Sequence, residues 1–137
     1  MYSVNGIILN KVVTIERCIK RIKEVYDQNP ENLADFTKQD SIILNIQRAC
    51  EASIDLAMHL VSERKLGLPK TSREAFQLLQ DANLIEASLA KTLKNMVGFR
   101  NIAVHDYQSI ELSILQSIIE KHLDDFTKFT KIVLAFV

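Results

Sequence analysis

The sequence predicts an all-α protein, an up-and-down bundle of four to five helices in a single domain over residues 1–137. Apolar residues recur at spacings of three and four along most of the chain, which is typical of amphipathic helices. No segment sustains the alternation of apolar and polar residues that a half-buried strand shows. The 137 residues include only three glycines and two prolines. The chain therefore has few places to turn, which favours a few long helices.

Length and charge limit the classes of function. A chain of 137 residues is long enough to bury a core and too short for two domains. The 17 basic residues equal the 17 acidic residues in number, so any binding of nucleic acid must come from a local group of cations. No apolar run reaches the ~18 residues of a membrane span, and the N-terminus lacks the pattern of a signal peptide. We therefore expect a cytoplasmic protein with no membrane partner.

The first predicted helix covers about residues 4–27. Isoleucine and valine recur on one side of it, and lysine and arginine occupy much of the other side. Asn29-Pro30 ends this helix, because proline cannot continue the hydrogen-bond ladder. A short irregular or single-turn segment is expected at residues 31–37.

The second predicted helix begins near residues 38–40. Asp40 suits its N-cap or the positive end of its dipole. The helix runs to about Lys65, and Gly67-Leu68-Pro69 stops it, since a glycine followed by a proline commonly terminates a helix. Cys50 within this helix and Cys18 in the first helix have no CxxC spacing, so we expect two buried free thiols.

Polar residues form a row on one face of the second helix: Arg48, Glu51, Asp55 and His59, spaced three, four and four. Three interpretations stay open at this point. The row can be a solvated face with ion pairs, a polar wall against a cleft or a partner subunit, or part of a metal site. The metal site would need ligands from elsewhere, because one histidine and two carboxylates are an incomplete set.

Three further helices complete the predicted bundle. Thr71 and Glu74 form a capping-box pair that begins a short helix, which runs to about Asp81. The fourth helix begins near Glu86, and a break at residues 106–109 separates it from the fifth. Three of the helices are about 20 to 28 residues long, which lets them pack side by side.

Reactive side chains gather at the end of the fourth helix. Arg100, His105 and Tyr107 lie within eight residues of an otherwise apolar segment. Arginine offers a rigid fork of donors for phosphate oxygens, and histidine can give or take a proton near neutral pH. Arg100 and His105 together could cleave RNA without a metal, with His105 acting on the ribose 2′-hydroxyl or the leaving 5′-oxygen.

The charge of this segment favours an anion site. Lys91, Lys94 and Arg100 are the only charged residues between Ser88 and His105, so the predicted patch carries +3 in a neutral protein. We expect Lys91 and Lys94 to support RNA binding beside Arg100. The opposing interpretation is structural, because a single arginine and histidine near a helix end often have no catalytic role.

Helical geometry restricts how the pair can act. Arg100 and His105 are five residues apart, about 140° around a regular helix, so they would not meet on one. Either the helix distorts or ends near Val104, which brings the imidazole toward the guanidinium, or the two side chains meet across a symmetric dimer.

The spacing of Arg100, His105 and Tyr107 resembles the motif of the HEPN superfamily. In that motif an arginine and usually a polar residue, here Asn101, precede three residues and a histidine. A tyrosine two residues further on is similar to the HepT-type toxins, which pair with a minimal nucleotidyltransferase (MntA) antitoxin. The chain also resembles that group at residues 40–45, 51–55, 66–69 and 96–99.

The resemblance implies a metal-independent ribonuclease toxin, without a cofactor, that works as a homodimer with two Arg–His pairs facing a shared cleft. Arg100 and His105 would be the catalytic pair, and Asn101 would orient His105 or contact the RNA substrate. Tyr107 would receive AMP from an MntA-like nucleotidyltransferase antitoxin, which blocks the cleft. The alternative is a non-catalytic helical module that binds nucleotides or a partner nucleotidyltransferase.

Overall fold

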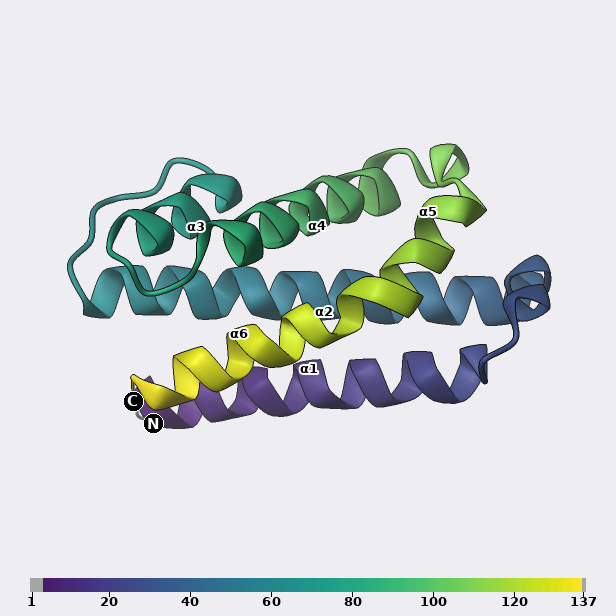
Figure 1. Ribbon diagram of the computed structural model, residues 1–137, viewed down its shortest axis with the longest axis horizontal. Helices are drawn as coiled ribbons and strands as arrows, with labels where there is room; N and C mark the ends of the chain where they lie inside the picture. Colours follow the sequence, from purple (N-terminus) through teal and green to yellow (C-terminus); the bar gives the residue numbers. More distant parts are fainter. Residues whose placement is uncertain (1–3, 137) are drawn as a thin grey trace.

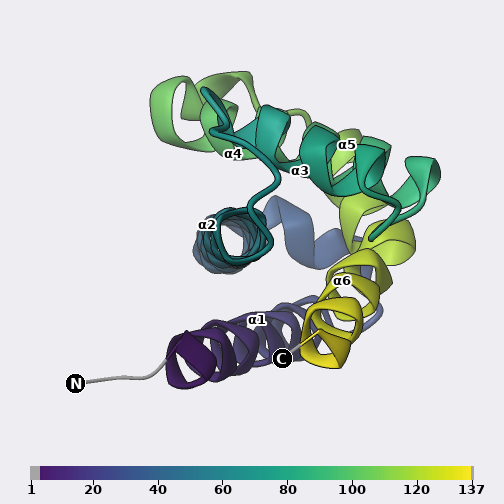
Figure 2. The ribbon, with the colours of Figure 1, turned by 90° about the vertical axis from the view of Figure 1, so that its left-hand side faces the viewer.

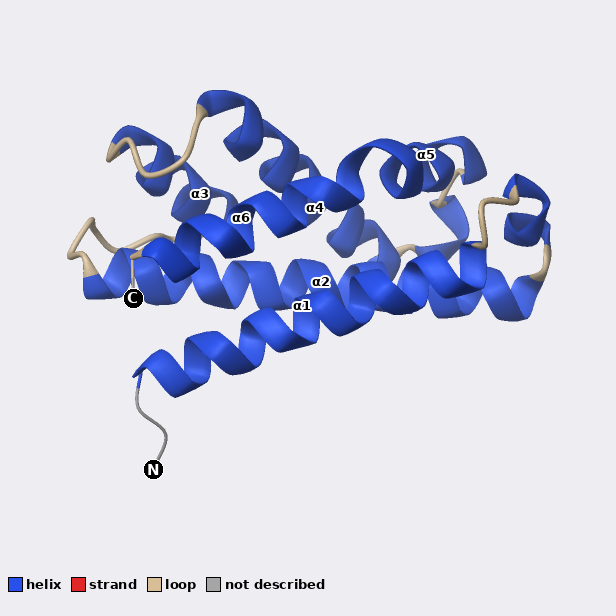
Figure 3. Ribbon diagram, turned by 60° about the horizontal axis from the view of Figure 1, so that its bottom comes forward, coloured by secondary structure: helices blue, strands red, loops and turns tan. Residues whose placement is uncertain are grey.

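A computed structural model describes residues 4–136 of the chain. Within these residues every regular element is helical, which confirms the all-α prediction (Figure 3). The long helices run alternately up and down the bundle (Figure 1). They are α1 (Val4–Tyr26), α2 (Phe36–Glu63), α4 (Ala87–His105) and α6 (Leu123–Ala135). The shorter elements are η1 (Pro30–Ala34), α3 (Ser72–Asp81), η2 (Tyr107–Ser109), α5 (Leu112–Ser117) and the π-helical turn η3 (Ile118–His122).

Helix α2 is the central element of the bundle. In the end-on view, α1 lies on one side of α2, and α4 with α3 lies on the other (Figure 2). Helix α6 closes the bundle between α1 and the layer of α3 and α4. Buried side chains from all of these helices join a single hydrophobic core, in which the rings of Phe76 and Phe129 pack edge to face with centroids 5.6 Å apart.

The start of α2 corrects the prediction. The helix begins at Phe36, and its N-cap is Asp35, whose carboxylate accepts a hydrogen bond from the Lys38 amide (3.0 Å). Asp40 lies inside the helix, more than one turn past this cap. The prediction of a start near residues 38–40 capped by Asp40 is therefore wrong, because Asp35 offers the same cap chemistry earlier. Asp40 is left free for a tertiary contact described below.

The end of α2 is closed by its own backbone. Lys65 takes the left-handed conformation, with φ of 54°. The Leu66 amide donates to the Val61 carbonyl (3.0 Å), and the Lys65 amide donates to the Ser62 carbonyl (3.2 Å). This pair of bonds is a Schellman motif with lysine in the position where glycine is common. The predicted end near Lys65 is confirmed, but Gly67 lies beyond the terminating turn.

Helix α3 begins as predicted. The Thr71 hydroxyl accepts a hydrogen bond from the Glu74 amide (3.1 Å). The Glu74 carboxylate does not return to Thr71, as a capping box would require, but accepts from the Lys70 amide (3.3 Å). The Arg73 side chain of α3 then reaches α4, where its Nε donates to the Lys94 carbonyl (3.3 Å).

A π-helical turn divides the last helical segment. The sequence predicts one continuous helix after the break at residues 106–109, whereas η3 separates α5 from α6. The Tyr26 hydroxyl at the end of α1 donates to the Glu120 carboxylate within η3. Burial, and then Glu120, raise the pKa of Tyr26 to about 12. The turn thus supplies a carboxylate that ties the end of α1 to the last segment.

The expectation of two buried free thiols is confirmed. Cys18 and Cys50 are both free and buried, and the Cys50 thiol donates to the Met96 carbonyl (3.5 Å). No described helix has the length and apolar character needed to cross a bilayer.

Candidate active site

Helix α4 stays regular through the candidate catalytic residues. It is α-helical from Ala87 to His105, and the Asp106 amide still donates to the Ile102 carbonyl (2.8 Å). No distortion near Val104 turns the histidine toward Arg100. The two side chains therefore project about 140° apart around the axis. The predicted distortion of the helix is wrong, whereas the helix does end near Val104, at His105.

Arg100 is half-buried on the side of α4 that faces α2. Burial, and then the Glu51 carboxylate, raise the pKa of the Cys50 thiol, and the positive charge of Arg100 opposes them. The guanidinium thus lies close to the middle of α2. Its buried Nε has no acceptor among the described residues. Since buried N–H groups in proteins are nearly always paired, this donor suits an anionic ligand.

Asn101 acts on Arg100 in this structure. Its side-chain oxygen accepts a hydrogen bond from Arg100 Nη1 (3.2 Å). The prediction gave Asn101 the role of orienting His105 or contacting RNA. Asn101 does share a helix face with His105, which lies four residues later, but its recorded contact holds the guanidinium.

His105 is the last residue of α4 and is exposed. Within residues 4–136 its imidazole has no recorded hydrogen bond or ion pair. The ring is therefore available to a substrate or to a second copy of the chain.

Tyr107 follows in η2, and its hydroxyl donates to the Asp40 carboxylate on α2. The tyrosine is 40% exposed, so a modifying enzyme can reach it. Burial, and then Asp40, raise the pKa of Tyr107 to about 12. Asp40 is the residue that sequence reasoning missed, because no local pattern links positions 67 residues apart.

These contacts set α4 antiparallel to α2, with Arg100 level with Cys50 and Tyr107 level with Asp40. Leu44 lies one turn from Asp40 on α2 and is 42% exposed, and Val104 on α4 is 44% exposed. Leu44 and Val104 thus expose apolar surface near the half-buried Arg100, which a subunit interface could cover.

The predicted patch of three cations does not form. Lys94 is half-buried, and its ammonium donates to the Gln77 side chain of α3. Lys91 is exposed, and it precedes Arg100 by nine residues, about half a turn around the helix axis. The +3 charge is therefore divided between opposite faces of α4, and the prediction of one patch is wrong.

The polar row of α2 separates into different contacts. Asp55 forms an ion pair with Lys11 of α1 (2.9 Å), and Glu51 accepts from the Gln47 amide (2.9 Å). No group of three metal-ligating side chains occurs in the part of the chain that the structure describes. An ion pair therefore accounts for Asp55 in this row, and a side-chain hydrogen bond accounts for Glu51.

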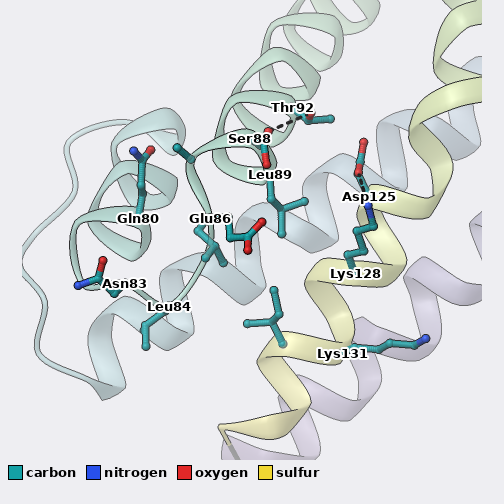
Figure 4. Close-up of a pocket in the computed structure, with 13 residues that line it drawn as sticks. Gln80, Asn83, Leu84, Glu86, Ser88, Leu89, Thr92, Asp125, Lys128 and Lys131 are labelled. Carbon is teal, nitrogen blue, oxygen red and sulfur yellow. Dashed lines mark hydrogen bonds and ion pairs between the residues drawn. The ribbon is translucent and has the colours of Figure 1, made fainter.

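A cavity of about 830 Å³ lies away from this site, between α6 and the connection from α3 to α4 (Figure 4). Its lysines and carboxylates balance one another: Lys128 lies 3.8 Å from Asp125, and Glu86 also lines the wall. Neither Arg100 nor His105 contributes to this cavity.

Comparison with known proteins places this geometry in a family. The family model described as "Ribonuclease HepT-like" matches residues 15–133. The chain is 51% identical over 131 residues to the mRNA nuclease HepT of Shewanella oneidensis, covering 96% of this chain and 98% of that protein. It is 29% identical over 106 residues to the tRNA nuclease HepT of Aphanizomenon flos-aquae, covering 77% and 72%.

Solved structures agree with the sequence comparison. A tri-AMPylated Shewanella oneidensis HEPN toxin in complex with MNT antitoxin matches with a TM-score of 0.90 at 51% identity, covering 94% of this chain and 97% of that chain. A toxin–antitoxin structure with AMP-PNP matches with the same TM-score at 50% identity, covering 94% and 98%. The helical bundle, the segment around Arg100 and both kinds of comparison agree: the chain belongs to the HepT-like ribonuclease family.

Proposed function

We propose that this protein is the toxin of a toxin–antitoxin pair, a cytoplasmic ribonuclease of one domain (residues 1–137) that acts as a homodimer. Arg100 and His105 cleave RNA, and AMP transfer to Tyr107 neutralises the toxin. One observation carries the proposal. The Arg100–His105–Tyr107 motif lies at the end of α4 in a chain 51% identical, with a TM-score of 0.90, to an AMPylated HEPN toxin.

The cleavage chemistry assigns complementary roles to the pair. His105 takes the proton of the ribose 2′-hydroxyl, and the 2′-oxygen attacks the adjacent phosphorus. The bond from phosphorus to the 5′-oxygen breaks, and the protonated His105 gives its proton to that oxygen. Arg100 holds the phosphate as negative charge builds on it. The products are a 2′,3′-cyclic phosphate and a 5′-hydroxyl, and no metal or cofactor takes part.

The regular helix supports the proposed homodimer. Because Arg100 and His105 point to different sides of α4, the arginine of one copy has to meet the histidine of the other. The exposed Leu44 and Val104 beside the site supply apolar surface for that interface. Asn101 supports the site by holding the Arg100 guanidinium, and Lys91 and Lys94 add positive charge for RNA binding away from the face of α4 that carries Arg100.

Tyr107 is the proposed point of control. An MntA-like nucleotidyltransferase would present a nucleoside triphosphate, and the tyrosine oxygen would attack its α-phosphorus as pyrophosphate leaves. The phenol proton would pass to Asp40, which already accepts its hydrogen bond. The attached nucleotide adds bulk and negative charge next to a cleft that must admit RNA.

The cleavage is tested with Arg100→Ala and His105→Ala. Each variant should lose RNA cleavage by a factor of about 100 or more, together with toxicity on expression. His59→Ala is the matched control, since His59 lies on α2 away from the motif and should leave both readouts unchanged. Normal cleavage by both α4 variants contradicts the assignment of the catalytic pair, whereas the absence of cleavage by the wild-type protein favours a non-catalytic module.

Neutralisation is tested by co-expression with an MntA-like nucleotidyltransferase. Intact-mass measurement should show one or more added AMP units, and Tyr107→Phe should remain unmodified and toxic. If wild-type protein carries no adduct and Tyr107→Phe is neutralised normally, modification is not the mechanism.

A further inference from the structure

A basic cleft of about 480 Å³ lies between α1 and α2, on the side of α2 away from Arg100. Eight residues line it: Thr14, Arg17, Cys18, Lys20, Arg21, Glu24, Asn45 and Arg48. Arg48 comes from the polar row of α2, and the other three basic side chains come from consecutive turns of α1. The cleft is thus a structured surface built by two packed helices.

The charge of this cleft is not compensated. Four of its side chains are basic and Glu24 alone is acidic. Within the described residues, Arg17, Lys20, Arg21 and Arg48 form no ion pair, whereas nearby Lys11 pairs with Asp55. Like charges held together repel one another, so this arrangement favours an anionic partner.

The floor of the cleft shows that these charges converge. The Cys18 thiol is buried there, with 5% of its surface exposed. Burial raises its pKa, and the charges of Arg48 from α2 and Arg17 from α1 both oppose that rise. Guanidinium groups from two different helices therefore lie near the same part of the cleft, an arrangement that suits the paired donors of arginine for a phosphate.

The cleft lies at the same level of the bundle as the proposed active site. Asn45 and Arg48 line it on one side of α2, while Cys50 and Glu51, less than one turn further, lie near Arg100 on the other side. The end-on view shows α2 between α1 and α4 (Figure 2). An extended polyanion that crosses α2 can contact both sites at once.

We propose that this cleft, formed by Arg17, Lys20, Arg21 and Arg48, binds the phosphodiester backbone of the RNA substrate outside the catalytic pair. The inference rests on the proposed ribonuclease function and extends it to a second contact region. Arginine side chains bind phosphate through paired donors and carry no information about the base. The cleft therefore increases the affinity for RNA and orients the bound strand. It does not select the position of cleavage.

The test measures binding of a short 2′-O-methyl oligoribonucleotide, which lacks the free hydroxyl needed for cleavage. The variant combines Arg17→Gln, Arg21→Gln and Arg48→Gln, and the readout is fluorescence anisotropy at several salt concentrations. The affinity should fall at least tenfold, and the slope of log affinity against log salt should fall by roughly 2, about 0.7 for each lost phosphate contact.

Two controls separate this inference from the catalytic proposal. A matched variant neutralises three exposed lysines outside the cleft, Lys23, Lys70 and Lys121, and should leave affinity and slope nearly unchanged. His105→Ala tests catalysis without removing a cation that holds phosphate: lost cleavage with a retained salt slope supports a separate binding cleft. Both triple variants are compared with wild type by thermal unfolding, which shows that they are folded.

Two results would overturn the inference. One is wild-type affinity and salt slope in the variant of the cleft. The other is normal RNA binding by that variant together with lost binding of the nucleotidyltransferase, which would assign the cleft to the protein partner.

Discussion

The Tyr107 phenol donates to a carboxylate that lies 67 residues earlier in the sequence, and burial together with this contact raises its pKa. Its pKa of about 12 means that the phenol keeps its proton throughout the physiological range. A phenolate is the better nucleophile, so transfer of a nucleotide to Tyr107 needs a base at the moment of attack. Asp40 already occupies that position.

Replacing Asp40 with asparagine should lower the pKa of Tyr107 toward its ordinary value near 10. The substitution removes the negative charge that disfavours the phenolate, while the part of the shift caused by burial remains. An NMR titration of the tyrosine ring measures the change, with Tyr26 as the internal reference. An unchanged titration of Tyr107 would contradict the contact with Asp40.

The reactive residues themselves are predictable from sequence, and their partners are not. Arg100, His105 and Tyr107 stand out because they are close in the chain and differ in type from their neighbours. Asp40, which bonds Tyr107, and Gln77, which holds Lys94, become neighbours only after the helices pack. The predicted patch of cations failed for this reason, since spacing alone did not show which lysine α3 engages.

At the level of the helices, backbone rules predicted most of the ends within a few residues. The break after His105 and the cap at Thr71 are local features, and they form as expected. The start of α2 was misplaced because Asp35 and Asp40 offer the same capping chemistry, and local sequence does not choose between them. The π-helical turn η3 escaped prediction because it inserts into a helix without disturbing the apolar pattern on either side.

The cap of α3 should contribute measurably to stability. Thr71→Ala removes the acceptor for the Glu74 amide and should lower the free energy of unfolding by about 1 kcal/mol. Denaturant unfolding measures this loss, and Thr71→Ser should restore most of it because the hydroxyl is retained. Equal stability of Thr71→Ala and wild type would show that the cap bond contributes nothing.

The contact between α1 and η3 should make the fold sensitive to alkaline pH. Because the pKa of Tyr26 is raised in the folded state, its stabilising contribution is complete below pH 10 and is lost as the pH rises to about 12. Unfolding experiments across this range should show a steep loss of stability in wild type. Glu120→Gln should reduce the steepness, since it removes the carboxylate that opposes ionisation. The same slope in both proteins would exclude a contribution from Glu120.

On the scale of the whole molecule, zero net charge conceals a separation of charge. Acidic residues balance basic ones over the chain, and the cavity beside α6 repeats that balance locally. The cleft between α1 and α2 does not. Composition therefore excluded a bulk polycation correctly, but it could not show which basic side chains the packed helices bring together.

The proposed dimer predicts complementation between inactive variants. Arg100→Ala and His105→Ala are each inactive alone, but a mixed dimer keeps one intact pair, the arginine of one copy with the histidine of the other. After unfolding and refolding together, the mixture should recover about a quarter of the wild-type cleavage, because about half of the dimers are mixed and each retains one site.

As the control, each variant is unfolded and refolded alone, and each should stay inactive. Size-exclusion chromatography verifies that the refolded proteins are dimers. No recovery in a mixture that does form dimers would mean that the arginine and histidine of one chain act together.

The regular last turn of α4 also affects how RNA cleavage depends on the concentration of the protein. In the proposed dimer each active site needs two chains, so a newly made copy would be inactive until it meets another. While the chains are scarce, the population of paired chains rises with the square of their concentration. Small changes in synthesis would then produce large changes in RNA decay, giving the cell a threshold below which the toxin can be carried silently.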